Sequence, residues 1–109
     1  MAVDLVYFIE MRDFSEIIDV APGLWIWRMV HRQWGPGQGW DPVVTSTYVE
    51  SGGAIAVLDP LAPPADAKDI WARLDAHPPT LAIVLKPDHV RDIDAFVHRY
   101  GSRPFGPYV

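Results

Sequence analysis

Apolar and polar residues are arranged in the first half of the chain in a way that predicts two β-hairpins. Residues 17–20 and 24–31 are rich in β-branched and aromatic side chains and flank an Ala-Pro-Gly turn. Residues 43–50 and 54–58 flank Ser-Gly-Gly, which is a strong turn signal. We therefore expect four antiparallel strands before residue 59.

The 24–31 strand is apolar at most positions. Trp25 and Trp27 fall on one face at a period of two, whereas Leu24, Ile26 and Arg28 fall on the other. Both faces of this strand are therefore expected to be largely covered.

After residue 59 the apolar spacing becomes helical. Residues 66–77 have apolar positions at i, i+3, i+4 and i+7, and Asp66 is placed to cap this helix. Residues 81–85 are a short apolar run typical of a strand buried on both faces, and residues 92–100 form a second amphipathic helix that stops at Gly101. Hairpins followed by β-α-β-α predict an α/β (α+β) fold, with a mixed sheet and helices on one outer face.

Length and composition set the domain count. A chain of 109 residues, half of it apolar or aromatic, fits one globular domain. Residues 1–11 are apolar without clean alternation, so we treat residues 1–13 as an N-terminal extension and residues 14–109 as the domain. No apolar stretch reaches the roughly 20 residues of a membrane span, and the start lacks a signal-peptide pattern, which indicates a soluble cytoplasmic protein without a membrane partner.

Charge and cysteine content narrow the chemistry. The net charge of −5 argues against a nucleic-acid partner, because proteins that bind nucleic acid present basic surface to phosphates. The chain has no cysteine, so it lacks a thiol nucleophile, and any metal would need His, Asp or Glu ligands.

Two loops contain the candidate binding residues. Residues 33–42 place Gly and Pro between Trp34 and Trp40, so this segment either covers a pocket or is packed onto the sheet by its indoles. Residues 86–91 follow a buried strand, the position where α/β sheets place their chemistry. Lys86 and Arg91 in this loop either hold an anionic ligand or make weak surface ion pairs.

The order of elements resembles the amino-terminal half of the metallo-β-lactamase superfamily of αββα hydrolases. Three stretches resemble a degenerate subgroup of that family: Pro-Gly-Leu-Trp at 22–25, Asp-Pro-Leu at 59–61 and Leu-Lys-Pro-Asp-His-Val-Arg-Asp at 85–92. The resemblance runs from near Phe14 to the end, and family members are roughly twice this length. It implies a truncated or split half-domain whose family activity is metal-dependent hydrolysis of an ester, amide or thioester.

The family's His-x-His-x-Asp-His loop is mostly replaced in this chain. When His89 is aligned with the second motif His, Pro87 stands at the first His, Arg91 at the Asp and Asp92 at the last His. The resemblance thus implies His89 and Asp92 as candidate ligands of zinc or another divalent metal, with Asp59 in a supporting role. Zinc normally takes three or four protein ligands, so we expect this chain alone not to complete the site.

Purely structural roles are open for the same residues. Asp59 can bind backbone N–H groups at a strand end, and His89 and Asp92 can be a loop histidine and a helix cap. Three hypotheses therefore remain: a hydrolase completed by a complementary C-terminal half, a non-catalytic module for a small acidic or aromatic ligand, and a half-domain that pairs with itself or a partner. The ligand-binding hypothesis uses Trp34, Trp40, Lys86 and Arg91.

Overall fold

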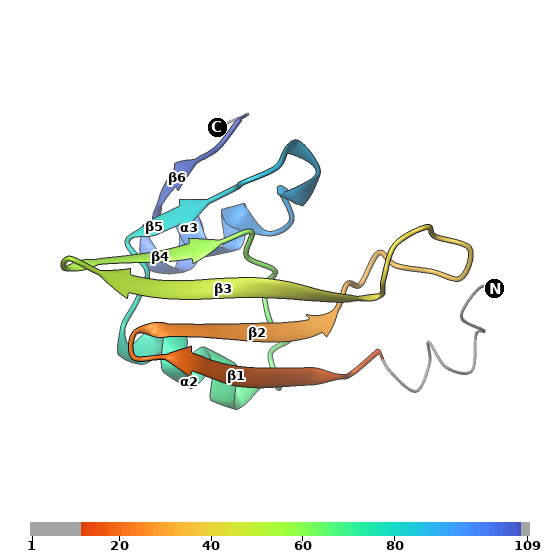
Figure 1. Cartoon of the computed structure of the whole chain (residues 1–109), viewed down its shortest axis with the longest axis horizontal. Coiled ribbons are helices and arrows are strands. Elements are labelled where there is room, and N and C mark those ends of the chain that lie inside the picture. Colours follow the sequence, from red (N-terminus) through yellow and green to blue (C-terminus); the bar gives the residue numbers. More distant parts are fainter. Residues whose placement is uncertain (1–11, 108–109) are drawn as a thin grey trace.

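The computed structural model describes residues 12–107, which form a six-stranded mixed sheet and two α-helices (Figure 1). The strands lie in the sheet in the order β1-β2-β3-β4-β5-β6, which is also their order along the chain. The mixed α+β sheet expected from the sequence is confirmed. Residues 1–11 lie outside the described part, so the strand considered there is untested and only residues 12 and 13 of the expected extension are seen.

Both predicted hairpins are confirmed. The first joins β1 (Ser15–Ala21) to β2 (Leu24–Val30), and the second joins β3 (Val43–Ser51) to β4 (Ala54–Leu58). β2 also pairs with β3, so the first four strands are antiparallel throughout. In the first turn Gly23 has φ of +74°, and a Cβ there would lie 3.0 Å from the Glu50 carbonyl oxygen, which explains the glycine.

The second half of the chain adds two parallel crossovers. α2 (Lys68–Ala76) connects β4 to β5 (Leu81–Ile83), and α3 (Ile93–Tyr100) connects β5 to β6 (Arg103–Phe105). A short 3-10 helix, η1 (Pro87–His89), precedes α3. α3 ends where the sequence predicts, because Gly101 adopts the left-handed conformation at φ +67° and its N–H bonds to the Val97 carbonyl.

Three sequence expectations about these elements are corrected. Asp66 is not the cap of α2, because it lies within a turn closed by the Ala67 N–H and the Pro64 carbonyl, and Ala67 stands at the cap position before the helix begins at Lys68. The 81–85 strand ends at Ile83, and Leu85 is 58% exposed. β6 was not expected, because a three-residue segment with a central proline carries little strand signal.

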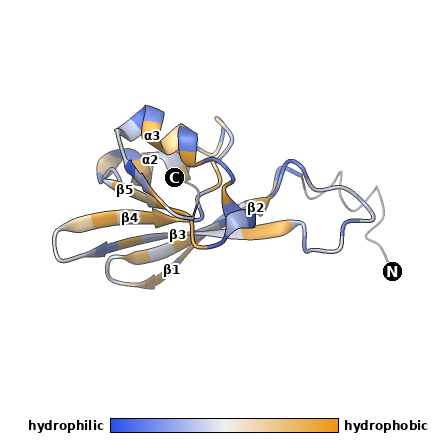
Figure 2. Cartoon of the chain, turned by 90° about the horizontal axis from the view of Figure 1, so that it is seen from above, coloured by the Kyte–Doolittle hydropathy of each residue, from blue (hydrophilic) through white to orange (hydrophobic). Residues whose placement is uncertain are grey.

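Both helices pack on the same face of the sheet (Figure 2). That face carries Trp25 and Trp27 of β2 together with the buried residues of the neighbouring strands, and the helices add Ile70, Leu74, Ile93 and Phe96. Leu24, Ile26 and Arg28 lie on the opposite face, which no described element covers, and remain partly exposed. The expectation that both faces of β2 are covered is therefore wrong for the described chain.

Neither described helix is long and apolar enough to cross a membrane.

Candidate functional site

A cleft of about 460 Å³ lies at the end of the sheet where the parallel strands β4 and β5 finish. Its walls come from the end of β2, the 33–42 loop, the start of β3 and the segment after β5. A smaller pocket of about 180 Å³ adjoins it and shares His31, Gln33, Asp88 and Arg91. The large cleft is lined by His31, Gln33, Trp40, Asp41, Val43, Val44, Asp88, His89 and Arg91.

Asp59 and His89 form a hydrogen-bonded pair beside this cleft. The His89 Nδ1 atom lies 2.9 Å from Oδ2 of Asp59, and the other carboxylate oxygen accepts the Leu85 N–H at 2.7 Å. A carboxylate accepts hydrogen bonds, so the His89 ring donates from Nδ1, and its Nε2 is the ring nitrogen outside this pair. The Leu85 contact is the structural role left open for Asp59, binding a backbone N–H at a strand end, and both carboxylate oxygens of Asp59 are engaged.

Arg91 lies half-buried at the inner wall of the cleft. Its Nη1 donates to the backbone carbonyls of Thr45 at 2.8 Å and Asp59 at 2.7 Å. No carboxylate of residues 12–107 forms an ion pair with it. Burial lowers the pKa of the Arg91 guanidinium, and the nearby charges of Asp59, Asp88 and Asp92 act in the opposite direction. The result is a cation that is partly desolvated and held by neutral groups.

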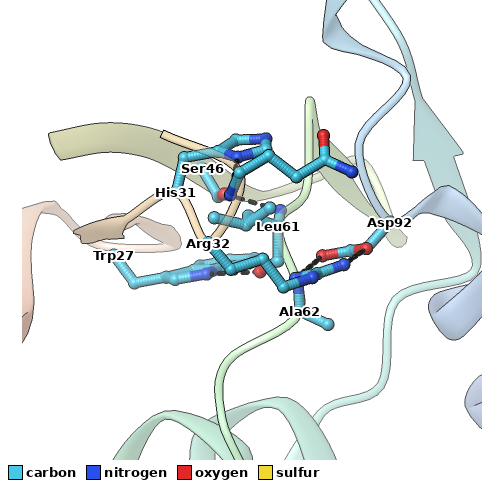
Figure 3. A network of polar contacts seen from close by, with 8 residues as sticks. Trp27, His31, Arg32, Ser46, Leu61, Ala62 and Asp92 are labelled. Carbon is cyan, nitrogen blue, oxygen red and sulfur yellow. Dashed lines mark hydrogen bonds and ion pairs between the residues drawn. The ribbon is translucent and has the colours of Figure 1, made fainter. Parts of the chain in front are cut away.

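The Asp92 side chain faces Arg32 and the backbone of Ala62 (Figure 3). Its carboxylate forms a bidentate ion pair with Arg32, with Arg32 Nη1 at 2.9 Å from Oδ2, and also accepts the Ala62 N–H at 2.7 Å. Although Asp92 precedes α3, its side chain makes no cap hydrogen bond to that helix. The side-chain helix cap expected of Asp92 is therefore wrong, and its carboxylate makes this tertiary contact instead.

The segment between β4 and α2 is fixed by the same network. The buried Trp27 Nε1 donates to the Leu61 carbonyl at 3.0 Å, and the Leu61 N–H donates to the Ser46 hydroxyl at 2.9 Å (Figure 3). Ser46 is buried and comes from β3. These bonds tie the backbone that follows Asp59 to the central strands, so the cleft wall is anchored by the core.

The two tryptophans of the 33–42 loop have different roles. Trp34 is 4% exposed, and its Nε1 donates to the Trp40 carbonyl at 2.7 Å, so it packs the loop onto the domain. Trp40 is 42% exposed, lines the cleft and meets the His31 ring edge-on at 5.3 Å between ring centres. Lys86 is exposed and is not part of the cleft lining. Of the four predicted binding residues, Trp40 and Arg91 line the same cleft, and Trp34 and Lys86 do not.

His31 was not among the candidate residues chosen from the sequence, and the structure places it in the cleft. Its backbone N–H bonds to the Pro42 carbonyl at 2.9 Å, which closes the base of the 33–42 loop, and its Nδ1 accepts the Gln33 N–H at 3.1 Å. Burial, followed by the guanidinium groups of Arg91 and Arg32, lowers the pKa of its imidazole. In the sequence, the only feature that could have indicated a place for His31 in the cleft was its position at the end of the aromatic strand 24–31.

The residues of this site do not fit a zinc ion held by this chain alone. Zinc needs three or four ligands, and residues 12–107 contain no group of three His, Asp or Glu side chains arranged to hold a metal. The carboxylates of Asp59 and Asp92 are used by hydrogen bonds and an ion pair within the protein. His89 is left as a single imidazole.

No protein-family model matches this chain, and no curated protein sequence matches it at a significant level.

Proposed function

We propose that this chain is a metallo-β-lactamase-like half-domain without hydrolytic activity of its own, and that its cleft binds a small aromatic carboxylate. Arg91 selects the acidic group. It is a half-buried guanidinium at the cleft wall without a carboxylate partner among residues 12–107, and a ligand carboxylate would supply the missing charge-assisted bonds. The exposed ring of Trp40 offers a surface for the ligand's flat apolar part.

The backbone at the site is consistent with a binding role. Asp59 and Arg91 have positive φ angles of 49° and 38°, and they are the non-glycine residues of the described chain in that conformation. Such conformations cost free energy and cluster at functional sites, where surrounding contacts hold them. Here Asp59 is held by Leu85 and His89, and Arg91 by its bonds to two carbonyls.

The cleft carboxylates limit the kind of acid that fits. Asp41 and Asp88 line the same cleft as Arg91, and Asp41 already accepts the Val43 N–H at 2.8 Å. Two negative groups near one guanidinium disfavour a multivalent anion such as phosphate, while a single carboxylate can approach Arg91. A volume of about 460 Å³ is in the range of small-molecule sites.

The test uses 3-phenylpropionate as the probe and follows the backbone and indole N–H resonances of the full chain. We expect the Trp40 indole and Arg91 signals to shift with 3-phenylpropionate, and to shift less with its neutral amide or with inorganic phosphate. Arg91→Met should weaken the response at least tenfold, and Lys86→Met, on the same loop but outside the cleft, should leave it unchanged. Because Arg91 also binds two carbonyls, Trp40→Ala serves as the second variant. Equal responses to the acid and the amide would reject the proposal.

The hydrolase alternative rests on one observation, the orientation of His89. A carboxylate that accepts the Nδ1–H of an imidazole leaves Nε2 directed for a metal, as do the carboxylates that hydrogen-bond to metal-bound histidines. The remaining ligands would then have to come from a second polypeptide. Metal analysis of the chain alone, and of the chain mixed with any product encoded just downstream, tests this alternative. Absence of bound metal in both samples rejects it.

A further inference from the structure

His31 borders both pockets of the candidate site. It lines the large cleft and the smaller pocket beside it, as Arg91 does. Its ring meets the exposed ring of Trp40 edge-on, at 5.3 Å between ring centres. A ligand that lies against Trp40 and reaches Arg91 with its acidic group would therefore also meet the imidazole of His31.

A backbone hydrogen bond fixes which ring nitrogen of His31 carries the proton. A backbone N–H can only donate, so Nδ1 of His31, at 3.1 Å from the Gln33 nitrogen, is an acceptor. A neutral imidazole has a single N–H, which must then be at Nε2. Among residues 12–107 this Nε2–H has no hydrogen-bond partner. Neutral His31 thus offers the site a donor that the protein itself does not use.

The charged and titratable groups around His31 come from its own segment, the 33–42 loop, η1 and the start of α3. They are Arg32, Asp41, Asp88, His89, Arg91 and Asp92. Burial, followed by the two guanidinium groups, lowers the pKa of the imidazole, and the Asp92 carboxylate acts in the opposite direction. The two cations therefore oppose protonation of His31 in the free protein. A carboxylate bound beside the ring would counter them and favour the protonated form.

We infer that His31 is a second contact for the ligand carboxylate, and that it couples binding of the acid to uptake of one proton from solvent. The inference rests on the ligand class proposed for the cleft. Nε2–H donates to a carboxylate oxygen while Arg91 supplies the permanent positive charge. The negative charge at Nε2–H favours addition of a proton at Nδ1, which produces an imidazolium paired with the acid. The Gln33 N–H then loses its acceptor, but Gln33 is exposed and water can take that place.

Calorimetric titration of the full chain with 3-phenylpropionate at pH 8 and pH 5.5 tests this coupling. The probe stays mostly ionised over that range, like a glutamate side chain with its pKa of about 4.3. We expect the wild-type protein to bind on the order of tenfold more tightly at pH 5.5. Proton uptake should appear as a binding heat that varies with the ionisation enthalpy of the buffer. His31→Asn should bind equally at both pH values, whereas His98→Asn, at an exposed position of α3, should behave like the wild-type protein.

A second measurement needs no variant and follows the imidazole resonances of the wild-type protein with pH, with and without the probe. We expect the pKa of His31 to be higher in the complex than in the free protein. His89 lines the same cleft and is the competing source of a pH effect. An unmoved His31 titration, or a pH effect that persists in His31→Asn and disappears in His89→Asn, would overturn the inference and leave the proposed ligand standing. Absence of binding at every pH would overturn both.

Discussion

Arg32 and Asp92, which are sixty residues apart in the sequence, form a bidentate ion pair that joins the end of β2 to the start of α3. Asp92 is largely buried, with 11% of its side chain exposed, whereas the Arg32 side chain is 59% exposed. The same carboxylate accepts the Ala62 N–H. Asp92 therefore links the start of α3 to two other segments of the chain, the segment after β2 that contributes Arg32 and the segment after β4 that contributes Ala62.

Asp92→Ala should lower the free energy of unfolding by about 2 kcal/mol, because the Ala62 N–H and Arg32 lose a charged acceptor. Arg32→Ala should cost less than about 1 kcal/mol, since the arginine is exposed and the Ala62 bond remains. Urea unfolding of both variants measures the difference. If Asp92→Ala leaves stability unchanged but abolishes divalent-metal binding, Asp92 is a metal ligand instead.

Asp59→Ala should change the tautomer of His89. In the wild-type protein the ring donates from Nδ1 to the Asp59 carboxylate, and without that acceptor the proton should move toward Nε2. Long-range ¹H–¹⁵N correlation spectra of the histidine ring distinguish the two tautomers. The variant should also lose about 1–3 kcal/mol of stability, because the Leu85 N–H is left without its partner. An unchanged His89 tautomer would mean that Asp59 does not orient the ring.

His31 should make the protein less stable as the pH falls. Its pKa is lowered in the folded state, so below about pH 6.5, the ordinary histidine value, the unfolded chain takes up a proton that folded His31 resists. The stability from neutral His31 is complete above that pH and is lost progressively below it. His31→Asn, which can keep an acceptor for the Gln33 N–H, should flatten the slope of unfolding free energy between about pH 7.5 and 5.5.

The matched control is His98→Asn, at an exposed position of α3 outside the cleft lining. It should leave the pH slope close to that of the wild-type protein. Equal slopes for His31→Asn and the wild-type protein would show that His31 titrates as freely in the fold as in the unfolded chain.

Gly106→Ala should loosen the edge of the sheet. A Cβ at Gly106 would lie 2.8 Å from the Val84 Cβ and 2.9 Å from the Val84 carbonyl oxygen, and the residue has φ of +154°. We expect a loss of about 1–3 kcal/mol and faster amide exchange at Val84, whose N–H bonds to the Phe105 carbonyl. Gly39→Ala, where an added Cβ meets no atom within 4 Å, is the control. Equal stability of the two variants would mean that β6 is not held in this position.

The candidate site was only partly predictable from the sequence. The position of residues 86–91 after a strand identified the loop, and His89 and Arg91 do reach the cleft. Nothing local predicted that Asp92 would pair with Arg32, because an ion pair across sixty residues depends on how the segments are packed together. For the same reason Trp34 and Trp40, alike in sequence, differ in that one is buried and the other lines the cleft.

The sequence alone determined the elements that depend on local periodicity and turn chemistry. The hairpins follow from strand runs broken by glycine turns, and α3 ends at Gly101 because a left-handed residue there costs glycine little. Tertiary structure decided which face of each strand is covered. In β2, Trp25 and Trp27 are buried because the helices pack on their side of the sheet. Leu24 and Ile26 are also apolar, but they lie on the other side and stay partly exposed. It also decided β6, whose three residues become a strand only by bonding to the segment around β5. Those choices depend on long-range contacts, which short stretches of sequence do not encode.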